Sequence, residues 1–201
     1  MEEERIAEQE ILETPAQTED EAPAKENAAV SLYEWVEAAI FSLICVAVVF
    51  TFLFRIVGVD GPSMHYTLMN HDRLILTNLF YKPERGDIVV INRYTQEPLV
   101  KRIIAVGGDT LDIDAETGEV ILNGEVLEEP YLDCFTPRNH FTGEVTIPEG
   151  HIFVMGDNRG NSHDSRSGDI GFVSEKDIMG KAVFRIWPLN QFGGLYEEKA
   201  D

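Results

Sequence analysis

The sequence predicts a mainly β domain of short antiparallel strands that is preceded by one N-terminal transmembrane helix. Two observations lead to this prediction. A run of 17 residues, Ala38–Phe54, contains no charged side chain. After residue 58 the apolar residues fall into short β-branched runs separated by glycine, proline and asparagine. Residues 59–195 therefore form one predicted domain, which is long enough to enclose a substantial core.

Residues 1–30 are predicted to be a disordered acidic tail. Glu, Ala, Thr and Gln dominate this segment, and Pro15 and Pro23 interrupt any long helix. The formal net charge of -20 excludes a nucleic-acid partner and disfavours binding to anionic headgroups, since both would need clustered basic residues. Residues 196–201 form a second short tail.

Residues 34–58 are predicted to form a membrane anchor. The uncharged run would extend about 26 Å as a helix, slightly less than a hydrocarbon core of roughly 30 Å, and its apolar flanks complete the span. A buried core helix is the alternative, although such helices seldom lack a polar face for so long. A cleavable signal sequence is disfavoured by the acidic leader. Arg5 and Lys25 on one side and Arg55 on the other leave the orientation undecided by charge.

Short apolar runs predict the strands of the domain. The dipeptide Asn123-Gly124 predicts a two-residue type I′ hairpin, because both residues tolerate the positive φ angles of that turn. No helix of ordinary length is expected after the anchor. The predicted strands are Arg73–Thr77, Asp87–Asn92, Leu99–Val106, Val120–Leu122, Val126–Leu127, Val145–Ile147, His151–Met155 and Ala182–Trp187.

Ser63 is a candidate nucleophile. It lies in the sequence Gly61-Pro62-Ser63-Met64, shortly after the apolar run, where a Gly-Pro turn would expose its hydroxyl. Most serines in such turns are turn formers, and a serine attacks a carbonyl only when a base accepts its proton. The five histidines show no local pairing with an acid of the kind that a hydrolase triad requires, so the base must be another group.

Lys101 is the candidate base. On a strand it shares a face with Leu99, Ile103 and Ala105, so its ammonium group is drawn toward an apolar layer. Full burial can lower a lysine pKa by about 3 to 5 units from its ordinary value of about 10.4, which produces a usable base. The alternative is an edge-strand lysine that extends to water, and Arg102 is expected to be a residue of that kind.

A polar loop, residues 156–166, follows a predicted strand. Its composition is typical of a turn-rich loop in which Asp, Asn and Ser side chains cap their own backbone. The loop also offers chemistry. A serine hydroxyl of the loop could hold a neutral lysine amine in line with Ser63, and Asp164 could form an ion pair with Arg166.

Together these segments resemble the bacterial type I signal peptidases, specifically the short Gram-positive form with one membrane anchor. Members of that family are membrane-anchored serine proteases with a Ser/Lys dyad, so the resemblance implies a signal-peptidase-like β domain. It extends from the anchor to about residue 187 and is carried by four motifs in matching order. The motifs are Gly61-Pro62-Ser63-Met64 with Thr67-Leu68, Gly86-Asp87-Ile88-Val89-Val90, Lys101-Arg102-Ile103-Ile104-Ala105-Val106-Gly107-Gly108-Asp109, and Gly156 to Arg166.

The resemblance also implies residue roles. Ser63 is the nucleophile and Lys101 the general base. Ser162 is the hydroxyl that orients the lysine, and Asp164 with Arg166 is an ion pair that supports the site. No metal or organic cofactor is implied.

Substrate and location are likewise implied by the resemblance. The substrates are signal peptides of secretory preproteins, cleaved after small-x-small sites, typically Ala-x-Ala. Met64, Leu68 and Val100 are expected to line the shallow apolar pockets that such sites need. The anchor lies in the bacterial cell membrane, with the tail in the cytoplasm and residues 59–195 outside it, and a monomer is expected.

Two positions depart from the family's pattern. Tyr66 stands where the family usually has proline, so a φ constraint is lost. Gly61 stands where some members have a serine whose hydroxyl helps to bind the oxyanion. Oxyanion binding would then depend mainly on backbone N–H groups, including that of Ser63.

Two other functions remain open. A self-cleaving Ser/Lys protein of related fold is disfavoured because the chain shows an acidic tail and an apolar span in place of a DNA-binding module. A non-catalytic, membrane-tethered binder of secretory proteins is disfavoured by the presence of both Ser63 and Lys101.

Overall fold

The computed structural model describes residues 28–94, 96–132 and 134–196, so most of the two predicted tails lies outside the described residues. The chain divides into two compact units at residues 46 and 47. The helix α2 (Ala28–Leu53) contains this boundary and begins within the last three residues assigned to the tail. Its window Leu32–Phe50 has a mean hydropathy of 1.9, and none of the window is buried. A core helix of a soluble domain would be mostly buried, so these properties favour a membrane anchor.

The helix ends earlier than the sequence predicts. The predicted anchor reaches residue 58, but Phe54–Gly58 forms strand β1, which pairs antiparallel with β2 (Arg73–Thr77). Ile56 and Val57 are β-branched and therefore suit an extended backbone. Val57 also packs against a buried cluster of the β domain. The end of the predicted anchor thus belongs to the sheet.

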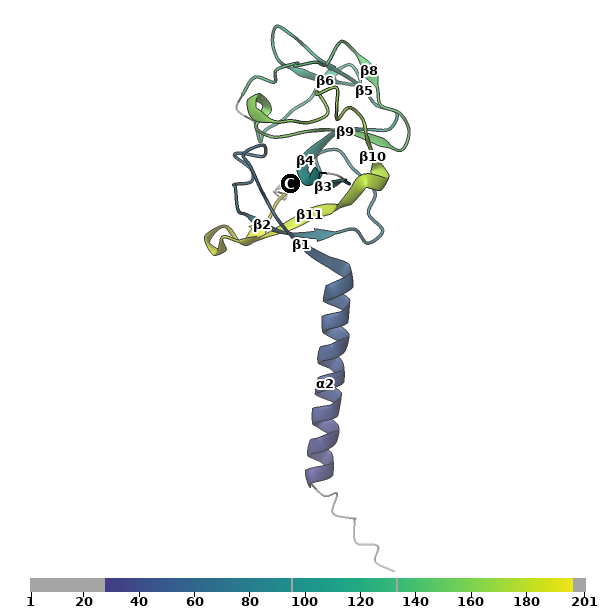
Figure 1. Ribbon diagram of the computed structural model, residues 1–201, viewed down its shortest axis with the longest axis vertical. Coiled ribbons are helices and arrows are strands. Elements are labelled where there is room, and N and C mark those ends of the chain that lie inside the picture. Colours follow the sequence, from purple (N-terminus) through teal and green to yellow (C-terminus); the bar gives the residue numbers. More distant parts are fainter. Residues whose placement is uncertain (1–27, 95, 133, 197–201) are drawn as a thin grey trace, which may run out of the picture. The chain divides into compact units, whose positions relative to one another are not determined.

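Two antiparallel sheets make up the β unit, which confirms the prediction of a mainly β fold. The larger sheet has the order β1-β2-β11-β3-β4-β9-β10, with β12 paired to β11, and the smaller has the order β7-β6-β5-β8. Figure 1 shows β5, β6 and β8 at one end of this unit and β1, β2 and β11 at the other. The remaining strands of the larger sheet are β3 (Ile88–Arg93), β4 (Gln96–Val106), β9 (His151–Met155), β10 (Val173–Ser174), β11 (Ile178–Trp187) and β12 (Gly193–Gly194). The smaller sheet consists of β5 (Thr110–Ile113), β6 (Val120–Leu122), β7 (Glu125–Val126) and β8 (Val145–Thr146).

Most predicted strands are present, with two informative differences. The four-residue strand β5 was not expected from its short, partly polar sequence. Strand β11 begins four residues before the predicted start, at Ile178, because Gly180 belongs to the strand. A Cβ at Gly180 would lie 2.9 Å from the Thr77 carbonyl oxygen, so close packing against β2 explains this glycine. The Asn123-Gly124 hairpin is confirmed, with positive φ angles of 54° and 84°.

Strands β3 and β4 lie at the centre of the larger sheet and have buried side chains on both faces. On β3, Ile88 and Val90 join one apolar cluster, whereas Val89 and Ile91 join another. The register places Lys101 of β4 opposite Val89. A charged side chain at this position is therefore surrounded by core.

Candidate active site

The structure brings Ser63 and Lys101 together. Ser63 lies in the turn that follows β1, where the Gly61 N–H donates a hydrogen bond of 3.0 Å to the Asn70 side-chain oxygen. Lys101 projects from β4, and its Nζ lies 2.7 Å from Ser63 Oγ. This separation suits proton donation in either direction, from the ammonium to the hydroxyl or from the hydroxyl to a neutral amine.

Burial changes the protonation of Lys101. Only 1% of the residue is exposed. Desolvation lowers the pKa of Lys101 to about 8; the Asp164 charge opposes this shift and the Arg166 charge supports it. With a pKa of about 8, roughly one molecule in ten carries a neutral amine at pH 7. Lys101 is therefore not an edge-strand lysine that extends to water, which was the alternative considered from the sequence.

The 156–166 loop packs directly against the nucleophile turn. The Asn158 backbone N–H donates to the Ser63 carbonyl oxygen at 3.0 Å, and its side-chain Nδ2 donates to the Pro62 carbonyl oxygen at 3.1 Å. A Cβ at Gly156 would collide with the Ser63 carbonyl oxygen and with Ser162 Oγ. Glycine is therefore required at position 156 by the close approach of the two segments.

Ser162 lies beside the dyad but does not bond to Lys101. Its Oγ is buried and has no hydrogen-bond partner among the described residues. It is nevertheless near enough to the Asp164 carboxylate to help lower the pKa of that group. The role of Ser162 in orienting the lysine stays a prediction.

The expected ion pair between Asp164 and Arg166 is present and almost fully buried. It is bidentate, with Nε–Oδ1 and Nη2–Oδ2 distances of 2.9 and 2.8 Å. Burial raises the pKa of Asp164, but the hydrogen bonds and charge of Arg166 outweigh it, so the net pKa is lowered. Asp164 Oδ2 also accepts a 3.0 Å hydrogen bond from the Gly156 N–H. The pair thus holds the loop where it meets Ser63.

The expected substrate-lining residues lie in the core. Met64, Leu68 and Val100 belong to one apolar cluster and are 1%, 0% and 9% exposed. Val100 is the most accessible of the three.

Arg102 is not the solvent-exposed residue that the sequence predicts. It is 5% exposed, and its Nε and Nη2 bond to the Asp157 carboxylate at 2.9 and 2.7 Å. Its Nη1 also donates to the Gly86 carbonyl oxygen at 2.9 Å. Alternation along β4 shows which face Arg102 occupies, but Asp157 comes from a loop 55 residues away. Only the fold brings this carboxylate to it.

The two departures from the family pattern differ in their surroundings. Gly61 has a φ of +87°, a conformation that other L-residues seldom adopt, so the backbone here accounts for glycine. Tyr66 is 79% exposed and lines a cavity of about 590 Å³, together with residues that include Arg102 and Tyr196.

Within the described residues, no three His, Cys, Asp or Glu side chains are grouped as a metal site requires.

Comparisons with known proteins identify the family of this chain. Residues 32–187 match the family described as signal peptidase, peptidase S26. Signal peptidase I S of Bacillus subtilis (strain 168) is 37% identical over 174 residues, which cover 80% of this chain and 92% of that protein. Signal peptidase I of Bacillus licheniformis is 37% identical over 186 residues, which cover 87% and 97%.

A solved structure of signal peptidase I from Enterococcus faecalis V583 is also similar. It shares 30% identity, covers 50% of this chain and 97% of that chain, and has a TM-score of 0.42. The family match spans most of the chain, and the Bacillus relatives exceed 30% identity over at least four fifths of it. On this evidence the chain belongs to the signal peptidase family S26 and is a peptidase.

Proposed function

We propose that the protein is a membrane-anchored serine endopeptidase that removes signal peptides from secreted preproteins, with Ser63 as nucleophile and Lys101 as general base. One observation carries this proposal: a buried lysine of lowered pKa lies 2.7 Å from the serine hydroxyl. Lysine in this state supplies the proton acceptor that an isolated serine lacks. The relatives named signal peptidase I support the choice of substrate.

Acylation begins with neutral Lys101. Its amine takes the proton of Ser63 as Oγ attacks the carbonyl carbon of the scissile peptide bond. When the tetrahedral intermediate collapses, the C–N bond breaks and the Lys101 ammonium returns a proton to the leaving amine. The mature protein departs with a free N-terminus, and the signal peptide remains as an ester on Ser63.

Deacylation uses the same base. Lys101 accepts a proton from water as the water oxygen attacks the ester carbonyl. The bond to Ser63 Oγ then breaks, Oγ regains the proton from Lys101, and the signal peptide leaves with a new carboxylate. Every proton in the cycle passes through one amine, so the cycle depends on the neutral form of Lys101.

The oxyanion would be bound by the Ser63 backbone N–H. No described residue accepts a hydrogen bond from this group, so it remains available for substrate. Gly61 contributes no hydroxyl at the position where some family members have one. Loss of an oxyanion donor costs about 100- to 1,000-fold in comparable sites, so chemistry here depends more heavily on the backbone donor.

The free edge of β4 offers a place for an extended substrate. Strand β4 pairs with β3 from Gln96 to Arg102, but its pairing with β9 begins only at Arg102. Along residues 96–101 one edge therefore has no ladder partner among the described strands. A substrate strand on this edge would direct every second side chain toward the domain, which matches a small-x-small preference. Val100 lies in this stretch, and Met64 and Leu68 lie behind it in the same apolar cluster.

The anchor would confine the enzyme to the membrane in which its substrates are inserted. We place residues 1–30 in the cytoplasm and residues 59–195 outside it, as a monomer. Tethering to a surface raises the effective concentration of a substrate that shares the surface.

Cleavage of a detergent-solubilised preprotein with an Ala-x-Ala site tests the proposal. Wild type should cleave once at this site, whereas Ser63→Ala and Lys101→Met should lose at least about a thousandfold in kcat/KM. Lys176→Met, which removes an exposed lysine, is the matched control and should retain full activity. Full activity in Ser63→Ala or Lys101→Met would overturn the dyad. A wild type that binds signal peptides without cleaving them would favour the tethered binder.

A further inference from the structure

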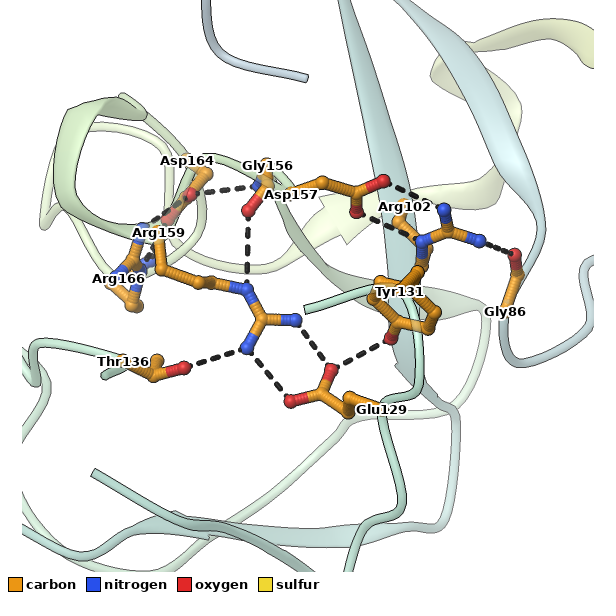
Figure 2. Close-up of polar contacts among 10 residues, drawn as sticks. All are labelled: Gly86, Arg102, Glu129, Tyr131, Thr136, Gly156, Asp157, Arg159, Asp164 and Arg166. Carbon is orange, nitrogen blue, oxygen red and sulfur yellow. Dashed lines mark hydrogen bonds and ion pairs between the residues drawn. The ribbon is translucent and has the colours of Figure 1, made fainter. Parts of the chain in front are cut away.

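A second buried charge cluster joins the 156–166 loop to residues 129–136, and the chemistry proposed above does not use it. Its centre is Arg159, whose side chain is fully buried. The guanidinium makes a bidentate ion pair with Glu129, in which Nη1 lies 2.8 Å from Oε2 and Nη2 contacts Oε1. Nη1 also donates to Thr136 Oγ1 at 2.8 Å, and Nε donates to the Gly156 carbonyl oxygen at 3.1 Å. Figure 2 shows these contacts converging on one guanidinium.

Glu129 also connects Arg159 to the neighbouring ion pair. The Tyr131 hydroxyl donates to Glu129 Oε1 at 2.7 Å. The ring centroid of Tyr131 lies 3.8 Å from the guanidinium carbon of Arg102, which in turn is paired with Asp157 (Figure 2). Residues 129 and 131, which follow the hairpin of the smaller sheet, therefore contact both arginines that hold residues 156 and 157.

The peptide held in this way is the one that touches the nucleophile. Arg159 Nε holds the carbonyl of Gly156, and Gly156 packs against the Ser63 carbonyl oxygen and Ser162 Oγ. The residue before Arg159 is Asn158, which donates hydrogen bonds to the carbonyl oxygens of Pro62 and Ser63. A continuous series of contacts thus runs from Glu129 through Arg159 to the backbone of Ser63.

Removing the Glu129 charge would leave a buried guanidinium without its counterion. Such a group turns toward water or draws water inward, because an unpaired charge in the interior is strongly disfavoured. Either response would loosen the bond from Nε to the Gly156 carbonyl. The loop would then no longer hold Ser63 at hydrogen-bond distance from Lys101.

We propose that Glu129 is a positioning residue for peptide-bond cleavage, which acts through Arg159 to hold residues 156–158 against Ser63. This inference rests on the proposed function. It assigns to the connection between β7 and β8 of the smaller sheet a share in aligning the nucleophile, which lies in the turn between β1 and β2 of the larger sheet. Glu129 itself does not touch the reacting atoms.

The test compares Glu129→Gln, which keeps the shape but removes the charge, with Glu129→Asp, which keeps the charge. Asp112→Asn is the matched control, because it removes another carboxylate that pairs with an arginine, Arg138, but lies on β5 and makes no hydrogen bond or ion pair to residues 156–166. For each full-length variant in detergent, kcat and KM are measured on the Ala-x-Ala preprotein. Active enzyme is counted by titration with a serine-acylating inhibitor, so that loss of folded protein does not enter kcat.

Glu129→Gln should lower kcat per active site about tenfold with KM unchanged within about twofold, because misalignment of a nucleophile by a fraction of an ångström has effects of this size. Glu129→Asp should recover most of the loss, and Asp112→Asn should match wild type. A kcat per active site for Glu129→Gln within about twofold of wild type would overturn the proposal, even with a lowered melting temperature.

If Glu129→Gln yields no folded enzyme, Tyr131→Phe decides the matter, since it removes only the hydroxyl that bonds to Glu129. We expect a fall in kcat of about two- to fivefold, and an unchanged kcat would contradict the proposal. Failure of this inference is distinct from failure of the proposed function. In the first case wild type and Glu129→Gln both cleave the preprotein while Ser63→Ala does not. In the second case wild type itself is inert.

Discussion

Lys101 and Arg102 are neighbours on β4, and both are buried cations, yet their electrostatic environments are opposite. Arg102 is hydrogen-bonded to a carboxylate, and although burial lowers its pKa, Asp157 raises it to a net value above the ordinary one. Lys101 forms no ion pair within the described part of the chain, and burial lowers its pKa to about 8. The difference shows how one strand can supply a permanent structural charge on one face and a titratable base on the other.

The largest expected effect comes from making Lys101 resemble its neighbour. Lys101→Arg retains a buried cation but cannot lose its proton at any pH at which the protein folds. We expect kcat/KM to fall about 1,000- to 10,000-fold, the range associated with loss of a general base. Steady-state cleavage of the Ala-x-Ala preprotein measures this, with Lys176→Arg as control. Activity within about tenfold of wild type would show that position 101 needs only a positive charge.

Stability should change in opposite directions at the two positions. The pKa of Lys101 is lower in the folded than in the unfolded chain, so below pH 8 folding carries the cost of burying the charge. This cost disappears as the pH rises from about 8 to about 10.5. Lys101→Met should therefore raise the free energy of unfolding by about 3 kcal/mol at pH 7, and by progressively less above pH 8.

Arg102→Met should instead lower the free energy of unfolding by about 3 to 5 kcal/mol, because it leaves Asp157 buried and unpaired. Thermal unfolding of both variants in the same detergent at pH 7 and pH 9.5 measures the two effects. If both substitutions destabilise the protein equally at pH 7, the contrast between the two faces of β4 is wrong.

The sequence singled out the residues of the candidate site, but it did not predict most of the contacts that support them. Ser63, Lys101 and the 156–166 loop lie in short motifs whose local order indicates their chemistry. The environment of Arg102 and the pairing of Glu129 with Arg159 could not be predicted, because their partners lie 55 and 30 residues away and no local pattern joins them. Buried ion pairs across loops depend on the completed fold.

The difference between local patterns and non-local contacts also explains which strands could be predicted from the sequence. Alternating apolar runs identified β2, β6 and β9 with their observed bounds, and Asn123-Gly124 identified the hairpin. Strand β1 was assigned to the anchor because its apolar, β-branched residues continue the composition of α2 without a break. What distinguishes β1 from the helix α2 is its pairing with β2, and strand pairing is a non-local interaction that the local sequence does not show.

The pH dependence of kcat/KM tests the central claim most directly, namely that catalysis needs the neutral amine of Lys101. Only the deprotonated form accepts the proton of Ser63, so kcat/KM for the Ala-x-Ala preprotein should rise as the pH rises. It should increase about tenfold from pH 7 to a plateau that begins at about pH 9, with an apparent pKa of about 8 on the acid limb. A kcat/KM that is constant between pH 6 and pH 9, or that falls across this range, would contradict the account.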